Sequence, residues 1–559
     1  MKKQKISPVI VVIGLIILIG IVGVITMIVQ HFQPTKEKAD LKAYYGITGE
    51  DQAALILNDK VLETGGMVQN EEIYLRYEDV ATYLDTGFYW DESVGQMLLT
   101  TADTTQTLTP DDGANLTENG APIVITGSDG AIYLALSSIT KYTDMDCSIY
   151  EQPKRAVMRT NWSGRQSVTA KQDGVVRLRG GLKSPVLTEV KAGDTMDYLE
   201  DLGDWVNVST ADGAVGYIES SKVSEAVEAP VHKENTNLEF TSLQKNYKIN
   251  LAWHQVTNQE GNAALAPTVA ETKGLTTISP TWFSITDNAG TLSSLASREY
   301  VDQAHGMGLE VWALVDNFNT EISTTDILKN KDARTNIINQ LLQSAESCGF
   351  DGINIDFERL GEDASSHYIQ FLRELTQQAH TKSLVISVDN PVPQNYNMYY
   401  KRGQQGKIVD YVINMGYDEH YSGSEEAGSV SSLPFVKDSI VQTLKEVPAR
   451  KVINAIPFYT RLWTVRFGQQ MPESEAIGMD KADAYVSQLQ MNVVWDESVG
   501  QNVATAEDSD AQYYIWMEDE KSLEEKMKLV QEYELAGAAE WKLGFERDSV
   551  WDIISQYLK

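Results

Sequence analysis

From Leu243 to Lys559, short hydrophobic runs alternate with longer stretches whose apolar residues recur at helical spacing, for example residues 332–348 and 368–381. The short runs have the length and the β-branched content of strands. Eight such strands that alternate with helices predict an α/β fold, a (β/α)8 TIM barrel with parallel strands. The predicted strands are residues 249–253, 277–283, 310–315, 352–358, 384–389, 411–417, 452–457 and 538–543. The gap between the last two has room for an extra hairpin.

A different pattern, an apolar run without any charged residue, covers residues 9–29. About 20 helical residues cross a bilayer, so we expect one N-terminal transmembrane helix. Lys2, Lys3 and Lys5 precede the run, which predicts a cytoplasmic N-terminus and an extracellular bulk. Residues 30–34 lack the small-residue pattern of a cleavage site, which favours an uncleaved signal-anchor over a signal peptide.

Between this run and the barrel, the chain shows short strand patterns separated by turn residues. Residues 54–62 predict a hairpin around Asn58 and Asp59, and residues 72–84 and 131–139 each predict a strand that runs into a short helix. The hexapeptide Trp-Asp-Glu-Ser-Val-Gly occurs at 90–95 and 495–500, and we interpret both copies as hairpin tips. The expected modules are residues 1–32 (cytoplasmic tail and anchor), 33–50 (stalk), 51–160 (small α+β module), 165–225 (all-β barrel), 226–242 (linker) and 243–559 (TIM barrel).

The net charge excludes some classes of partner, and the cysteine and histidine content excludes some kinds of stabilising or metal site. The formal net charge of −33 argues against nucleic acid and against anionic lipid surfaces. Cys147 and Cys348, the two cysteines, fall in different predicted modules and imply no disulfide framework. The histidines show no ligand spacing, so we expect no metal and no cofactor.

The segment with the clearest chemistry is Asp351-Gly-Ile-Asn-Ile-Asp-Phe-Glu358. On a strand, its apolar side chains face one way, whereas Asn354, Asp356 and Glu358 face the other. Both faces of a parallel sheet are buried, so such a polar row is costly unless its groups are paired or functional. Two carboxyls on one strand also shift each other's pKa values, which acid catalysis requires.

This segment resembles the signature of glycoside hydrolase family 18, which includes chitinases and endo-β-N-acetylglucosaminidases. Met415-Gly-Tyr-Asp418 resembles the family's sixth-strand pattern, and Trp541 resembles the tryptophan of its eighth strand. Residues 279–283, 417–423 and 456–461 are similar to the branch that contains spore-cortex-lytic N-acetylglucosaminidases. Upstream, residues 165–225 resemble a bacterial SH3-like domain, a frequent binder of cell-wall peptide or glycan that can also be a simple spacer. Residues 51–160 resemble the N-terminal module of copper amine oxidases, without copper ligands.

The resemblance implies a retaining reaction in which the substrate's own 2-acetamido group is the nucleophile, an exception to the two-carboxylate scheme. It implies that Glu358 is the proton donor, that Asp356 orients the acetamido group, and that Tyr417 binds its oxygen. The expected substrate-binding residues are Asn354, Asp418, Trp541, Met415, Trp282 and Arg461. The family consensus has an aspartate where this chain has Asn354, which can donate a hydrogen bond to Asp356 but cannot share a proton. We therefore expect activity with an altered pH profile.

The resulting hypothesis is a single-pass, monomeric enzyme of the cell membrane whose bulk lies at the bacterial cell wall. It would cleave β-1,4-linked N-acetylglucosamine glycans as an endo-β-N-acetylglucosaminidase. Peptidoglycan is favoured because an anchored enzyme meets its own wall at high effective concentration. The alternatives are a chitinase, a lectin-like glycan-binding protein with a weak or inactive barrel, and a structural surface protein.

Overall fold

The computed structural model describes residues 8–84, 86–230 and 240–559, which form two compact units. The first unit contains residues up to Thr86 and the segment 110–237, and the second contains residues 87–109 and 238–559. The expected module 51–160 is thus divided, because its segment 87–109 belongs to the second unit.

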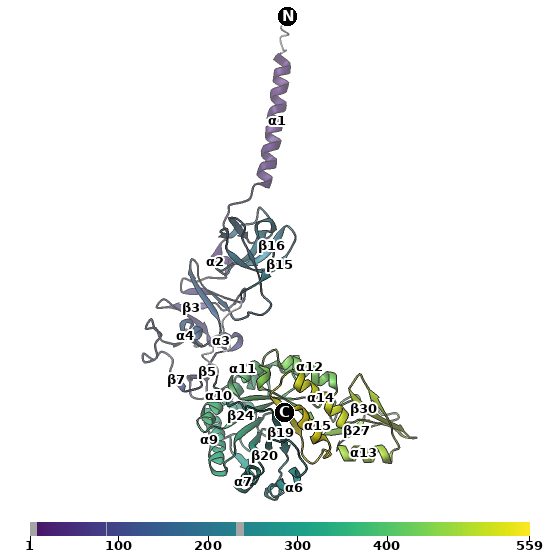
Figure 1. Cartoon of the computed structure of the whole chain (residues 1–559). Helices are drawn as coiled ribbons and strands as arrows, with labels where there is room; N and C mark the ends of the chain where they lie inside the picture. Colours follow the sequence, from purple (N-terminus) through teal and green to yellow (C-terminus); the bar gives the residue numbers. More distant parts are fainter. Residues whose placement is uncertain (1–7, 85, 231–239) are drawn as a thin grey trace. The chain divides into compact units, whose positions relative to one another are not determined.

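Eight parallel strands close into a barrel in the second unit, which confirms the predicted fold (Figure 1). Closure comes from pairing of the first strand with both the second and the last. The strands are β19 (Ile249–His254), β20 (Thr277–Ile285), β22 (Glu310–Asp316), β23 (Gly352–Asp356), β24 (Val385–Pro391), β25 (Tyr411–Met415), β26 (Val452–Pro457) and β32 (Gly537–Trp541). A short strand, β21 (Leu292–Ser294), pairs antiparallel with β20.

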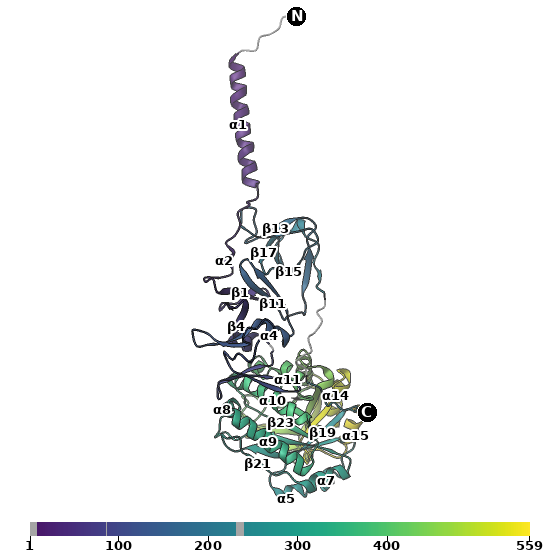
Figure 2. The same ribbon diagram turned by 90° about the vertical axis from the view of Figure 1, so that its left-hand side faces the viewer.

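Helices cover the outside of the barrel, and Figure 2 shows β19 and β23 enclosed by them. The longest, α9, begins where the Asn330 side chain caps Asp332 N and Ala333 N, and ends at Gly349 in the left-handed conformation that favours glycine. Its buried face joins the outer core between strands and helices. The helices are α5 (Gln259–Asn262), α6 (Leu265–Val269), α7 (Arg298–Gly306), α8 (Thr324–Lys329), α9 (Lys331–Cys348), α10 (Ser365–His380), α11 (Arg402–Ile408), α12 (Leu433–Thr443), α14 (Glu520–Glu532) and α15 (Val550–Tyr557).

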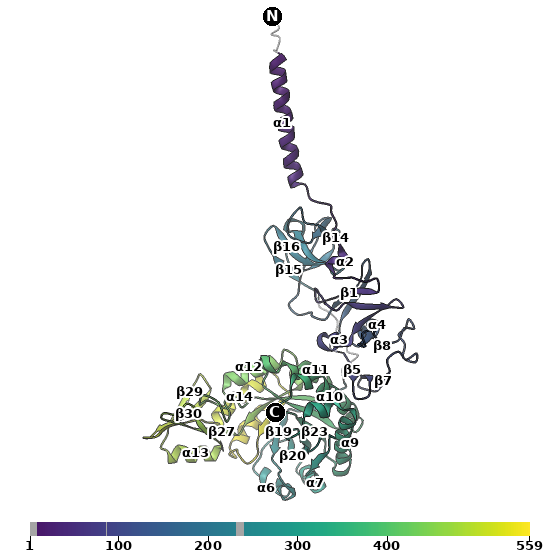
Figure 3. The ribbon, with the colours of Figure 1, turned by 180° about the vertical axis from the view of Figure 1, so that it is seen from behind.

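An insertion follows β26 and is larger than the expected hairpin. It contains a five-stranded antiparallel sheet and one helix, which stand beside the barrel strands in Figure 3. Its elements are β27 (Tyr459–Arg466), β28 (Glu473–Gly478), α13 (Met479–Gln488), β29 (Asn492–Asp496), β30 (Gln501–Glu507) and β31 (Ala511–Trp516). The hexapeptide at 495–500 forms the turn between β29 and β30, as predicted.

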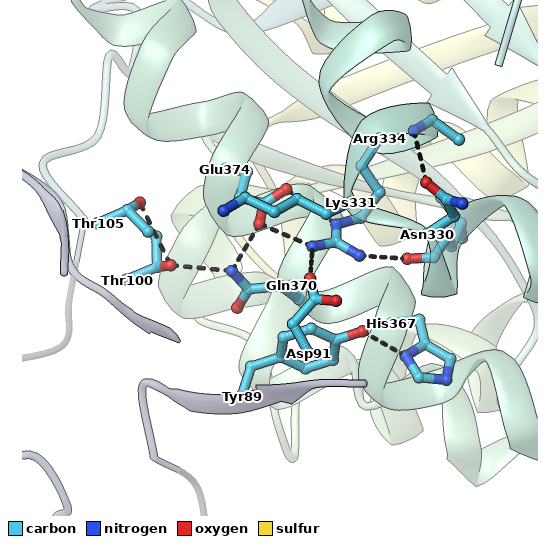
Figure 4. Close-up of polar contacts among 12 residues, drawn as sticks. Tyr89, Asp91, Thr100, Thr105, Asn330, Lys331, Arg334, His367, Gln370 and Glu374 are labelled. Atoms are coloured by element: carbon cyan, nitrogen blue, oxygen red, sulfur yellow. Dashed lines mark hydrogen bonds and ion pairs between the residues drawn. The ribbon is translucent and has the colours of Figure 1, made fainter. Parts of the chain in front are cut away.

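A second small sheet, β5 (Phe88–Asp91), β6 (Gln96–Thr100) and β7 (Thr105–Leu108), packs on α9 and α10 (Figure 4). Its tip is the other hexapeptide copy, again a hairpin turn. Arg334 of α9 pairs with Asp91 of β5 at 2.6 Å and with Glu374 of α10 at 2.9 Å. The side chains of Arg334 and Asp91 are fully buried, so this sheet belongs to the core of the second unit.

The first unit holds two β-rich parts. The small module contains β1 (Gln52–Leu57), β2 (Lys60–Val61), β3 (Gly66–Gln69), β4 (Glu72–Arg76), α3 (Tyr77–Tyr83), β8 (Val124–Thr126), β9 (Ile132–Ala135), α4 (Leu136–Lys141), β10 (Asp146–Glu151) and β11 (Lys154–Arg159). The predicted hairpin at Asn58 and Asp59 and both strand-to-helix segments are present. The SH3-like sheet contains β12 (Gln166–Thr169), β13 (Gly174–Arg177), β14 (Val186–Val190), β15 (Thr195–Asp201), β16 (Trp205–Ser209), β17 (Val215–Glu219), with η1 (Ser220–Lys222) and β18 (Val227–Glu228).

Two expectations for this unit, a free stalk at residues 33–50 and a linker that begins at residue 226, differ from the structure. The predicted stalk packs on the SH3-like sheet, because Ala39 N donates to Val186 O and Tyr44, in α2 (Leu41–Tyr44), donates its hydroxyl to Val215 O. The linker expected from residue 226 begins later, because β18 pairs with β12. The rest of that linker, residues 231–239, lies outside the described residues.

The predicted N-terminal helix is α1 (Pro8–Phe32). Its segment Val9–Met27 has a mean hydropathy of 3.2 and is long and apolar enough to cross a membrane.

Candidate active site

The signature strand β23 directs its polar side chains into the barrel, as the alternation predicts. Asn354 is fully buried and Asp356 is 6% exposed. The strand ends at Asp356, two residues earlier than expected, so half-buried Glu358 lies in the loop that follows the strand. Phe357 packs between them in the outer core, stacked on Phe371 of α10 at 5.6 Å between ring centroids. Packing of this ring holds the two acids at the carboxyl end of the barrel, where TIM-barrel enzymes place their chemistry.

Asn317, which the sequence analysis missed, fixes the backbone of Glu358. Its amide nitrogen donates to Glu358 O at 2.8 Å, and its amide oxygen accepts from Glu358 N at 2.8 Å. The same nitrogen also donates to Thr324 Oγ1 at 3.0 Å. A side-chain amide that pairs with both peptide groups of one residue holds that residue in place without contacting its carboxyl.

The two acids of the signature are poised to keep protons. Burial raises the pKa of Asp356 well above its usual range, and the carboxyls of Asp389, Glu358 and Asp316 raise it further, in that order. Burial also raises the pKa of Glu358, with Asp418 and Asp316 adding to the effect and Arg359 opposing it. A carboxylic acid with a raised pKa is suited to donate a proton near neutral pH.

Asp356 also has an open hydrogen-bonding position. Its Oδ1 is buried and has no hydrogen-bond partner among the described residues. Buried acceptors are nearly always satisfied in folded proteins, and an exception of this kind is typical of a site that receives a ligand donor.

The end of β25 brings Met415, Tyr417 and Asp418 to the same end of the barrel. Tyr459 of β27 donates its hydroxyl to Asp418 Oδ1, and its ring lies edge-on to Tyr417 at 6.2 Å between centroids. Burial and the nearby Asp356 raise the pKa of Tyr417, which therefore stays a neutral O–H donor. Arg461 also lies on β27 and donates to Ser474 Oγ at 3.0 Å.

The two predicted tryptophans have different positions. Trp541 ends β32, is only partly buried, and meets Trp253 edge-on at 5.8 Å between centroids. Trp282 is 1% exposed and lies in the outer core, where its indole nitrogen donates to Asn262 Oδ1 at 2.8 Å. The expectation that Trp282 binds substrate is therefore wrong, because its side chain points away from the barrel interior.

Asn354 makes four hydrogen bonds, and none of them is to Asp356. Its amide oxygen accepts from Trp253 Nε1 at 3.0 Å and Ser279 Oγ at 3.2 Å. Its nitrogen donates to Ser387 Oγ at 3.0 Å and Asp389 Oδ1 at 2.8 Å. The expected donation to Asp356 is thus wrong, because both amide hydrogens are used by β24.

Asp316 and Asp389 were also missed by the sequence analysis. Asp316 ends β22 and accepts from Ser284 Oγ at 2.8 Å and Phe318 N at 3.0 Å. The available signal was the period-two placement of Ser387 and Asp389 in a strand that begins with the apolar residues Val385 and Ile386. Asp351, at the start of the signature segment, has a structural role, since its Oδ2 accepts from His305 Nε2 and Val311 N. Across the described part of the chain, no group of three or more His, Cys, Asp or Glu residues could hold a metal.

Comparisons with known proteins agree with this geometry. Residues 215–546 match the model for glycosyl hydrolases family 18, and residues 174–224 match the bacterial SH3 domain. The chain is 28% identical over 265 residues to the "Uncharacterized glycosylase YvbX" of Bacillus subtilis, covering 45% of this chain and 76% of that protein.

It is also 28% identical over 236 residues to the "Cortical fragment-lytic enzyme" of Bacillus subtilis, covering 41% of this chain and 54% of that protein. The chain thus spans about half the length of that relative. A chitinase structure from Chromobacterium violaceum superimposes with a TM-score of 0.50 at 21% identity, covering 56% of this chain and 99% of that one, which supports the fold. The family model covers more than half of the sequence and includes Asp316, Asp356, Glu358, Asp389 and Asp418. The chain therefore belongs to glycosyl hydrolase family 18 and is a glycosidase.

Proposed function

We propose that this protein is a retaining endo-β-N-acetylglucosaminidase that acts on peptidoglycan by substrate-assisted catalysis. Membership of family 18 implies an N-acetylated glycan substrate, such as chitin or peptidoglycan. The observation that carries the proposal is that Asp356, two residues before Glu358, has a buried Oδ1 without a hydrogen-bond partner among the described residues. A substrate acetamido N–H would satisfy that oxygen.

In this proposal Glu358 protonates the glycosidic oxygen while the acetamido carbonyl oxygen attacks the anomeric carbon. The bond to the leaving sugar breaks and an oxazolinium ion forms. Asp356 holds the acetamido N–H and stabilises the positive charge that develops, and the Tyr417 hydroxyl donates to the acetamido oxygen. Water then attacks the same carbon and gives a proton to Glu358, which restores the acid. Retention follows from two displacements at one carbon.

The remaining residues have supporting roles. Trp541 forms a floor for the N-acetylglucosamine ring, since an indole face packs well against a sugar's C–H groups. Asp418, Met415 and Arg461 line the end of the barrel near the bound sugar. Asn354 acts indirectly, through the hydrogen bonds described above.

Two features outside the barrel favour peptidoglycan over chitin. The apolar helix α1 is suited to anchor the chain in a cell membrane with the N-terminus in the cytoplasm. The SH3 domain fits a protein that works at a bacterial cell wall. The similarity to a cortical fragment-lytic enzyme points in the same direction.

The test is cleavage by the full chain in a mild detergent, with purified peptidoglycan and N-acetylated chitin oligosaccharides as substrates. We expect new N-acetylglucosamine reducing ends from peptidoglycan by mass spectrometry, and none from fully de-N-acetylated glycan. Glu358→Gln should abolish them, whereas Glu362→Gln, an exposed acid four residues further on, should not.

Equal cleavage of de-N-acetylated glycan would refute substrate assistance. Cleavage of chitin oligosaccharides alone would establish the chitinase alternative. Binding of either glycan without cleavage would establish the lectin-like alternative.

A further inference from the structure

Asp389 is a buried acid on β24 to which the proposed mechanism assigns no role. It is 1% exposed, and its Oδ1 accepts the hydrogen bond from Asn354 Nδ2 at 2.8 Å. Asn354 occupies the position at which the family consensus has an aspartate. The side chain that replaces that consensus acid is thus hydrogen-bonded directly to an acid on the next strand.

The register of the parallel strands places three acids side by side. Asp316 of β22 pairs with Asp356 of β23, and one step along the β23–β24 ladder from the Ile355–Val388 pair brings Asp389 beside Asp356. All three side chains are at most 8% exposed. Neighbouring buried carboxyls cannot all ionise, because each negative charge opposes the next.

Positive charge near this row is scarce. No Lys, Arg or His of the described residues forms an ion pair with Asp356 or Asp389. The groups that face the pair are acids and phenols from neighbouring elements, namely Asp316 of β22, Glu358 after β23, Tyr368 of α10 and Tyr417 after β25. Arg359, the nearby cation, acts on Glu358. Without a cation, neutralising this buried row requires bound protons.

We propose that Asp389 is the positioning residue that shares one proton with Asp356, in place of the acid missing at position 354. When Asp356 ionises to hold the acetamido N–H, its proton moves to Asp389, and it returns when the acetamido group leaves. No proton enters or leaves the pair, so the step balances. This inference rests on the proposed function for its catalytic consequence, but the shared proton itself is a property of the folded chain.

The direction in which the acidic limb of kcat/KM shifts distinguishes this role from that of a permanently charged carboxylate that takes no proton. If Asp389 holds the shared proton, its removal leaves Asp356 alone in a buried site and makes Asp356 harder to ionise. The acidic limb of kcat/KM, which reports that ionisation, then moves to higher pH. If Asp389 instead stayed ionised throughout and accepted no proton from Asp356, its removal would delete a negative charge, and the same limb would move to lower pH.

The experiment measures kcat/KM against pH for the full chain and three variants on an N-acetylated oligosaccharide. For Asp389→Asn we expect an upward shift of the acidic limb by about one pH unit, which is about a tenfold loss on that side. The double variant Asn354→Asp/Asp389→Asn returns an acid to the row and should restore the limb. Ser387→Ala removes the other acceptor of Asn354 without removing a carboxyl, and should lower kcat/KM equally at every pH.

A second readout does not need activity. The folded chain holds the shared proton above the ordinary pKa of about 3.9 for an unfolded aspartate, so wild-type stability falls as the pH rises through that range. Asp389→Asn leaves Asp356 harder to ionise, so the fall of the thermal midpoint should extend to higher pH, whereas Ser387→Ala should leave the pH range of this fall unchanged. If the wild type cleaves no glycan, the proposed function fails, and the pH range of this fall alone still tests the shared proton. A downward or absent limb shift, or an unchanged pH range of the fall in thermal midpoint, overturns the inference.

Discussion

Removing the Asn317 amide should impair the enzyme without touching any acid. In Asn317→Ala, the peptide N–H and C=O of Glu358 each lose a hydrogen bond of 2.8 Å. A protein hydrogen bond contributes about 1 kcal/mol net, so about 2 kcal/mol is lost from the arrangement that holds the acid. If this whole loss is added to the free energy of the transition state, kcat/KM falls about 30-fold.

The assay is kcat and KM on an N-acetylated oligosaccharide, together with the thermal midpoint. The loss should appear mainly in kcat, because the substrate-binding side chains are unchanged and only the proton donor is displaced. Asn319→Ala is the matched control, since Asn319 also bridges backbone groups of this segment, accepting from Glu321 N and donating to Thr286 O, but makes no contact with Glu358. Equal losses in both variants, or an unchanged kcat in Asn317→Ala, would refute the reasoning.

Three further predictions concern charge and packing. Because Asp418 raises the pKa of Glu358 above its ordinary 4.5, Asp418→Asn should lower that pKa and move the alkaline limb of kcat/KM to lower pH; an unmoved limb would contradict this. Arg334→Met leaves two carboxyls buried together and should lower the unfolding free energy by about 3–5 kcal/mol in urea, whereas Asp91→Asn should cost less; equal losses would count against the ion-pair account. Trp541→Ala should raise KM about tenfold and Trp541→Phe much less, as expected for a lost aromatic contact of up to about 1.5 kcal/mol, and an unchanged KM would exclude Trp541 from the sugar site.

Local patterns predicted the barrel well, because its strands are continuous apolar runs and its helices are amphipathic. The period-two alternation also predicted that Asn354 and Asp356 lie inside the barrel, as they do, whereas Glu358 lies in the loop after the strand. The same alternation could not place Trp282, because both faces of a parallel strand are apolar and the sequence does not say which face is inward. Its hydrogen bond to Asn262 is visible only in the folded chain.

Contacts between distant segments were beyond the local patterns. Residues 87–109 read as part of the small module, yet their hairpin docks on α9 and α10 through Arg334, because nothing in a hairpin's own sequence identifies the surface that will cover it. Asn317 and Tyr459 likewise reach the site from other segments, the first from the loop after β22 and the second from the insertion.

The acid row shows how one rule of strand geometry generates most of this site. Inward-facing positions recur every second residue, and Asp316, Asp356 and Asp389 each occupy one of them, so the parallel register of β22, β23 and β24 aligns the three acids. The consensus family arrangement stacks two acids along one strand, whereas this chain places the second acid across the ladder and links it through Asn354. Either arrangement puts a second carboxyl beside Asp356. Under the proposed proton sharing, the chemistry requires an inward acid next to Asp356, and that acid can come from either strand.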